Sequence, residues 1–113
     1  MFDSVTMNAL GSALDGLAAR QRSIANNIAN VNTPNYHAQR VSFEEALAAS
    51  VTQGSGIVAP TMKRSLDPTQ LNGNNVNLDT ETLSNIDTVL RFQFAAAAAN
   101  AQFTSVRAAL GGG

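Results

Sequence analysis

Apolar residues recur at helical spacing through the first third of the chain. They step by three and four positions, which is the heptad pattern of a coiled-coil seam, and Gln21 is the one polar residue in the series. We predict a helix from about Asp3 to Asn32, roughly 40 Å long at about 1.5 Å per residue, with Asp3 or Ser4 as its N-cap. The apolar seam positions are Met7, Leu10, Leu14, Leu17, Ile24, Ile28 and Val31.

A second helical periodicity fills the last third of the chain and predicts a helix from Asp79 to about Leu110. Asp79 is the expected N-cap, which makes Leu78 and Leu83 the two ends of a hydrophobic staple, and Gly111–Gly113 ends the helix. Two apolar lines run along it, so it has more than one contact face. One line comprises Val89, Phe92, Ala96, Ala99, Phe103, Val106 and Leu110, and the other comprises Leu83, Leu90, Phe94, Ala97, Ala101 and Ala108.

The uncharged segment between Arg91 and Arg107 is a poor candidate for a membrane span. It is shorter than the roughly 20 apolar residues that a span requires, and it is mostly Ala with Gln93, Asn100 and Gln102 inside it. A helix that other helices cover on several sides fits this composition better.

A turn and a short helix are predicted after the first long helix. Pro34 and Asn35 suit the second and third positions of a type II turn, in which the third residue has a positive φ. The segment after the turn begins an extended stretch or a new helix. Ser42 and Glu45 have capping-box spacing, which predicts a short Ala-rich helix over Phe43 to about Ser50.

Residues 51–77 show no convincing period and are expected to form a loosely ordered connector. Ile57–Ala59 can form a short extended piece before Pro60, and the Asn72-Gly73 pair can form a hairpin turn. The predicted fold is therefore mainly α. Two long terminal helices form a coiled-coil-like hairpin, joined by the short helix and this connector. The expected divisions of the single domain are residues 1–32, 33–78 and 79–113.

Composition and charge exclude several classes of function. Charged residues make up 13% of the chain and the net charge is −1, so nothing favours nucleic acid or an anionic membrane. The absence of Cys excludes disulfides and thiolate chemistry. The N-terminal residues have no basic region and no long apolar run, so we expect no cleavable secretory signal.

Candidate catalytic and metal-binding residues do not cluster. His37 is the only His, and a packing or solvated role suits it better than metal binding. Glu44 and Glu45 are adjacent, so on a helix they point in different directions and do not form a catalytic pair. No phosphate-binding loop is present. We therefore expect no enzyme activity, no cofactor, no metal and no small-molecule substrate.

The faces of the two long helices that lie outside the seams are Ala, Asn, Gln and Ser rather than Lys and Glu. A monomeric hairpin would carry charge on its outer faces, whereas small neutral faces allow close approach of further helices. These residues fit two arrangements equally. The helices pair and pack against copies or relatives in an oligomer, or they form a simple antiparallel dimeric bundle.

Two motifs resemble the bacterial flagellar rod and hook proteins. The first is similar to the family pattern N-N-I-A-N-x-N-T-P-G-Y, and the second to G-N-N-V-D-L-D-x-E. The chain departs from them with Asn35 for Gly, which suits the same turn, and Asn77 for Asp. The first motif comprises Asn26, Asn27, Asn30, Asn32, Thr33, Pro34, Asn35 and Tyr36. The second comprises Gly73, Asn74, Asn75, Val76, Leu78 and Asp79.

The resemblance implies a structural subunit of the rod in the flagellar basal body. It is greatest to the proximal-rod members, which share Thr80-Glu81 and Leu90–Gln93. It implies self-association into a helical tube that transmits torque through the periplasm, and uncleaved export by the flagellar type III apparatus. Other rod subunits and a membrane-ring or export-gate adaptor at the rod base are the implied partners. The alternative is a small coiled-coil adaptor that binds one partner helix.

The assembly seam expected from these observations draws on both long helices. The Asn residues of the first motif have two interpretations, namely a helix surface with a C-cap, or hydrogen bonding between subunits or to the turn backbone. The seam residues are Leu10, Leu14, Leu17, Ile24, Ile28, Val31, Leu83, Leu90, Phe92, Phe94, Phe103, Val106 and Leu110.

Overall fold

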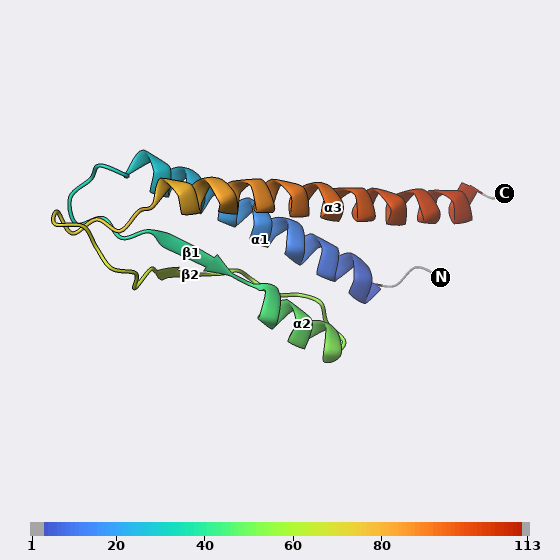
Figure 1. The fold of residues 1–113 in the computed structure, drawn as a ribbon. Helices are drawn as coiled ribbons and strands as arrows, with labels where there is room; N and C mark the ends of the chain where they lie inside the picture. The colour runs from blue at the N-terminus through green and yellow to red at the C-terminus, as the bar shows by residue number, and fades with distance from the viewer. Residues whose placement is uncertain (1–3, 112–113) are drawn as a thin grey trace.

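The computed structural model describes residues 4–111 and confirms a mainly α fold. Two long helices pair, and a short helix and a two-stranded antiparallel sheet lie beside the first of them on one side of this pair (Figure 1). The expected roles of Asp3, Gly112 and Gly113 at the helix ends lie outside the described residues. The elements in chain order are α1 (Ser4–Ala29), β1 (Gln39–Ser42), α2 (Glu44–Thr52), β2 (Thr61–Arg64) and α3 (Leu78–Gly111).

Helices α1 and α3 run in opposite directions and pack against each other. They lie together where α1 ends and α3 begins, and they separate toward the chain termini (Figure 1). The described chain measures 65 × 25 × 15 Å. Its length is set by α3, whose 34 residues span roughly 50 Å at about 1.5 Å per residue.

The first helix ends three residues earlier than the sequence predicts, at Ala29 rather than Asn32. Backbone bonds after Ala29 close tighter turns, such as Val31 N–H to Ile28 C=O and Thr33 N–H to Asn30 C=O. Such three-residue bonds are typical of helix ends. The helix therefore unwinds gradually toward Pro34, which disfavours helical geometry in the residue before it.

Two of the predicted helix caps are wrong. Helix α3 is capped by Asn77, whose Oδ1 accepts hydrogen bonds from the Asp79 and Thr80 N–H groups at 3.0 and 3.2 Å. Asp79 therefore lies inside the helix, where its charge still complements the helix dipole. Ser42 belongs to β1, and the N-cap of α2 is Phe43, whose side chain cannot accept a hydrogen bond.

The connector is mostly loop, and it contributes one strand to the small sheet. Strand β2 pairs antiparallel with β1, with Gln39 opposite Arg64 and Ser42 opposite Thr61. The connection between the two strands contains α2. The Asn72-Gly73 pair therefore does not form the turn between them. The strand also begins at Thr61, after the piece at residues 57–59 that the sequence favoured. The turn before β2 is fixed to α1, because the Ser12 Oγ donates to the Gly56 C=O at 2.8 Å.

The apolar core is small and lies where α1, β1 and α2 meet. Its centre is the ring of Phe43, which packs on Gly16 of α1 beside Leu17 and Val41. Phe92 of α3 covers the same cluster from the other side. Within residues 4–111, no helix has the length and apolar character needed to cross a membrane.

Substitution of the two glycines in α1 by Ala should have opposite effects. A Cβ at Gly16 would overlap the buried Phe43 ring, whereas a Cβ at Gly11 meets nothing within 4 Å. We expect Gly16→Ala to lower the free energy of unfolding by about 1–3 kcal/mol. Gly11→Ala should raise it by up to about 1 kcal/mol through helix propensity. Denaturant unfolding of both variants tests this, and a stabilised Gly16→Ala protein would contradict the packing.

Candidate functional site

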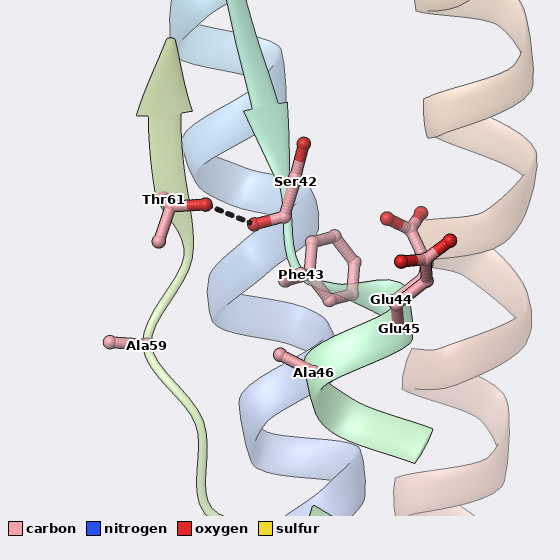
Figure 2. Close-up of a pocket in the computed structure, with 7 residues that line it drawn as sticks. All are labelled: Ser42, Phe43, Glu44, Glu45, Ala46, Ala59 and Thr61. Atoms are coloured by element: carbon pink, nitrogen blue, oxygen red, sulfur yellow. Dashed lines mark hydrogen bonds between the residues drawn. The ribbon is translucent and has the colours of Figure 1, made fainter. Parts of the chain in front are cut away.

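The chemistry of an active site is not evident in the described part of the chain. Within residues 4–111, no group of three or more His, Asp or Glu side chains is placed to hold a metal ion. A hollow of about 410 Å³ lies beside the start of α2 (Figure 2). In the hydrogen bond drawn in Figure 2, the Thr61 hydroxyl donates to the Ser42 C=O at 3.3 Å. Its lining holds the carboxylates of Glu44 and Glu45 and the hydroxyls of Ser42 and Thr61, but no His, Lys or Arg side chain.

The two sequence motifs meet in space, and Asn74 makes the central connection. Its side chain is fully buried. The Nδ2 group donates to the C=O groups of Asn30 and Thr33, both at 2.8 Å, at the end of α1. Its Oδ1 accepts from the Val76 N–H at 2.8 Å. One amide therefore satisfies backbone groups of both motifs. We call the contacts made by the side chains of Asn27, Asn74 and Asn75 the asparagine clasp.

Asn75 makes the next part of the clasp by extending the small sheet. Its Oδ1 accepts from the Ala38 N–H at 2.7 Å, and its Nδ2 donates to the C=O groups of Ser65 and Asp67 at 3.1 Å. The Ser65 N–H donates to the Ala38 C=O at 2.7 Å. The loop before α3 is thereby attached to both strands, which fixes where α3 begins.

Asn27 connects α1 to β1 and α3. Its amide pairs with both backbone groups of Gln39, at 2.9 and 3.0 Å, as a neighbouring strand would. Its Nδ2 also donates to Glu81 Oε1 on α3 at 3.1 Å, and Arg40 Nη1 lies 2.6 Å from the same oxygen. Glu81 is fully buried, and its Oε2 has no hydrogen-bond partner among the described residues.

The turn within the first motif has the predicted positive φ at its third residue. Asn35 has a φ of 63°, which confirms the positive φ expected of the third turn position, and the Tyr36 N–H donates to the Thr33 C=O at 3.3 Å. The Asn35 N–H donates to the Asn72 C=O at 2.9 Å. Gly73 has a φ of +82°, and the Asn35 side chain lies where a Cβ on Gly73 would be. The turn therefore packs against the second motif at a point where only a residue without a Cβ fits opposite Asn35.

Arg20 fixes α2 to α1. Its guanidinium binds both carboxylate oxygens of Glu44 at 2.6 Å and the Val41 C=O at 2.9 Å, and it lies over the Phe43 ring. This hydrogen bonding lowers the pKa of Glu44 and raises the pKa of Arg20. A lowered carboxyl pKa stabilises the fold at pH values above the ordinary pKa of Glu, about 4.3. That contribution is lost as the pH falls through the lowered pKa. Because the Glu44 side chain is 41% exposed, the contribution is at most about 1 kcal/mol.

The predicted seam residues divide by exposure. Leu17 and Ile24 are buried in the chain itself, whereas Leu10, Leu14, Val31, Phe92 and Val106 are half-buried. A third set is exposed, namely Ile28, Leu83, Leu90, Phe94, Phe103 and Leu110. On α3 the exposed set lies on two faces, with Leu83, Leu90 and Phe94 on one and Phe103 and Leu110 on the opposite one.

Within the motifs, the Asn residues also divide. Asn27, Asn74 and Asn75 are buried in the clasp, while Asn30 binds the Asn26 C=O and Thr33 at the surface. The exposed motif residues are Asn26, Asn32, Thr33, Pro34, Asn35, Leu78 and Asp79, while Tyr36 and Gly73 are half-buried and Val76 is buried.

Several residues of the site were not identified from the sequence. Glu81 was noted only as part of the Thr80-Glu81 pair shared with proximal-rod members, and Arg40, Arg20 and Ser12 were not considered. Each makes its contact with a residue more than 20 positions away. The available signal was that Arg20, Arg40 and Glu81 are charged residues in a sequence with few charges. A buried charge needs a partner, so each of them was a candidate for an ion pair.

Comparison with known proteins identifies relatives along almost the whole chain. A family model described as flagella basal body rod protein matches residues 7–37, which include most of α1 and the first motif. The chain is also similar to the flagellar basal body rod protein FlgB of Bacillus subtilis (strain 168). The two are 31% identical over 124 aligned positions, which cover 97% of this chain and 96% of that relative.

The clasp predicts a large difference between two Asn-to-Asp substitutions. In Asn74→Asp a carboxylate replaces the amide that donates to the Asn30 and Thr33 C=O groups, so a buried charge faces two acceptors. We expect a loss of about 2–4 kcal/mol in the free energy of unfolding. Asn32→Asp changes an exposed side chain and should cost less than about 0.5 kcal/mol. Equal effects in denaturant unfolding would contradict the role of Asn74.

Proposed function

The chain belongs to the flagellar basal body rod protein family, whose members are structural components of that rod, and from this we propose how it builds the rod. Copies of the chain associate through α1 and α3 into a helical tube. The tube spans the periplasm and transmits torque. The buried clasp supports this role, because it fixes the two helices to each other and to the turn, so that each subunit can act as a stiff unit.

The observation that carries the proposal is the exposed apolar line on α3. Leu83, Leu90 and Phe94 are 69%, 52% and 78% exposed, and Ile86 lies beside them at 54%. They lie on the face that α1 does not cover. An apolar patch of this kind marks an interaction surface in a soluble protein. The Ala residues that follow Phe94 have short side chains and would allow a neighbouring helix to come close.

The implied partners follow from the same surface and from family membership. We propose that other rod subunits contact the ends of this chain's stack, and that an adaptor of the membrane ring or export gate contacts the rod base. The flagellar type III apparatus would export the chain without cleavage. The alternative, a coiled-coil adaptor for one partner helix, would use the same face of α3 but would form a discrete complex.

The test is a gene deletion complemented with variants of the exposed line. Leu83→Asp should abolish hooks and motility, since a carboxylate buried without a partner in the assembled rod costs several kcal/mol, and about 1.4 kcal/mol already lowers incorporation tenfold. The matched control is Thr82→Asp, at an exposed neighbouring position, which should restore motility. Leu17 is unsuitable for this purpose, because at 3% exposure its substitution would unfold the chain.

Two results would contradict the proposal. Normal flagella in the deletion strain would remove the rod function. Normal hooks with Leu83→Asp would remove the exposed line of α3 from the assembly. Unfolding of purified Leu83→Asp should match the wild type, because Leu83 is already exposed in the monomer. This measurement separates an assembly defect from a folding defect.

A further inference from the structure

An apolar groove lies where the three helices meet. Its volume is about 390 Å³, and it is open to solvent along one side. Leu17 and Phe43 form its floor, and both belong to the buried core. Two charged residues, Glu44 and Arg91, also line the groove. Its apolar lining is formed by Ala13, Leu17, Phe43, Leu47, Phe94 and Ala95.

The end of α3 carries an apolar face that the described chain does not cover. Phe103 and Leu110 are 58% and 85% exposed, and with the half-buried Val106 they line one shallow hollow. The three residues are spaced i, i+3 and i+7. This is the anchor spacing of helices that bind in apolar grooves.

This end of α3 also extends beyond the start of α1 in the described chain. The helices are antiparallel, and Asn27 contacts Glu81. Because both helices rise by about 1.5 Å per residue, Ser4 lies near the level of residue 104. Residues 105–111 of α3 therefore extend past Ser4, where the described part of α1 begins.

We propose that the end of α3 from one copy of this chain inserts into the groove of a second copy. Phe103, Val106 and Leu110 would be the anchors. The inference rests on the proposed rod function and specifies which two surfaces meet. The contact joins two different patches, so it is heterologous and continues from copy to copy rather than closing as a dimer.

The end of α3 can occupy the groove of a second copy of this chain but not the groove of its own chain. Leu110 is 15 positions beyond Ala95, which lines the groove, so the two are roughly 22 Å apart along the same straight helix. The end of α3 therefore cannot reach the groove of its own chain. Two helical turns in one groove also bury less than the roughly 1,000 Å² of a stable interface. The contact should therefore be weak between two free chains and form mainly in the assembled rod.

Cysteine cross-linking tests the contact directly, because the wild-type chain has no Cys. Ala13→Cys places a thiol in the groove, and Leu110→Cys places one at the end of α3. A disulfide requires Cα atoms within about 7 Å, so this pair can be joined only between chains. In basal bodies from cells that carry the double variant as their sole copy, mild oxidation should give a ladder of linked multimers.

The matched controls move one thiol away from each surface. Asp15→Cys with Leu110→Cys, and Ala13→Cys with Thr104→Cys, use exposed positions outside the groove and the hollow. Their cross-linking should be at least roughly tenfold lower, because their thiols lie beyond disulfide reach. A mixture of the two single variants, Ala13→Cys and Leu110→Cys, should give linked pairs and no larger species.

The outcomes separate this inference from the rod function. Hooks on cells with the double variant show that it folds and assembles. Hooks without the Ala13–Leu110 ladder would overturn the docking contact and leave the rod function intact. A linkage of Ala13→Cys to a different rod protein alone would also overturn it. Loss of the rod function itself would appear separately, as normal flagella in the deletion strain.

Discussion

Buried asparagine amides, rather than a large apolar core, hold the end of α1, the turn, the sheet and the start of α3 together. Asn27, Asn74 and Asn75 each satisfy backbone groups on a segment distant in sequence. A hydrogen bond of this kind contributes about 1 kcal/mol net, whereas leaving one buried partner unsatisfied costs about 1–3 kcal/mol. The clasp therefore acts mainly by penalising any other arrangement of the turn, the sheet and the helix ends.

Most other features of the fold depend on this constraint. The amide of Asn74 closes the end of α1, and Asn75 sets the place where α3 begins, so the two helices start their antiparallel pairing from a fixed point. Farther from the clasp, the core around Phe43 is small and the helices separate. Their apolar residues remain exposed there, which is the property expected of a subunit whose packing is completed by its neighbours in a rod.

The sequence predicted the long helices, the positive φ of Asn35 and the location of both motifs, because these features are local. Heptad spacing and turn chemistry are read within a few residues. The cap of α3 was misassigned because Asn77 and Asp79 both have an oxygen that can accept from the first turn. Strand β1 lies in the segment after the turn, for which an extended stretch was one of two alternatives. Strand β2 was missed because it has four residues and, with Thr61 and Lys63, lacks an apolar alternation. The pairing of Asn27 with Glu81 joins positions 54 apart, and no local pattern encodes it.

A double-mutant cycle on Asn27 and Glu81 tests whether the clasp couples α1 to α3. The free energy of unfolding is measured for the wild type, Asn27→Ala, Glu81→Ala and the double variant. Because Asn27 and Glu81 are hydrogen-bonded across the two helices, we expect the two substitutions not to be additive, with a coupling energy of about 1 kcal/mol or more. Additive effects, within about 0.3–0.5 kcal/mol, would show that Asn27 and Glu81 do not couple the two helices and would contradict this role of the clasp.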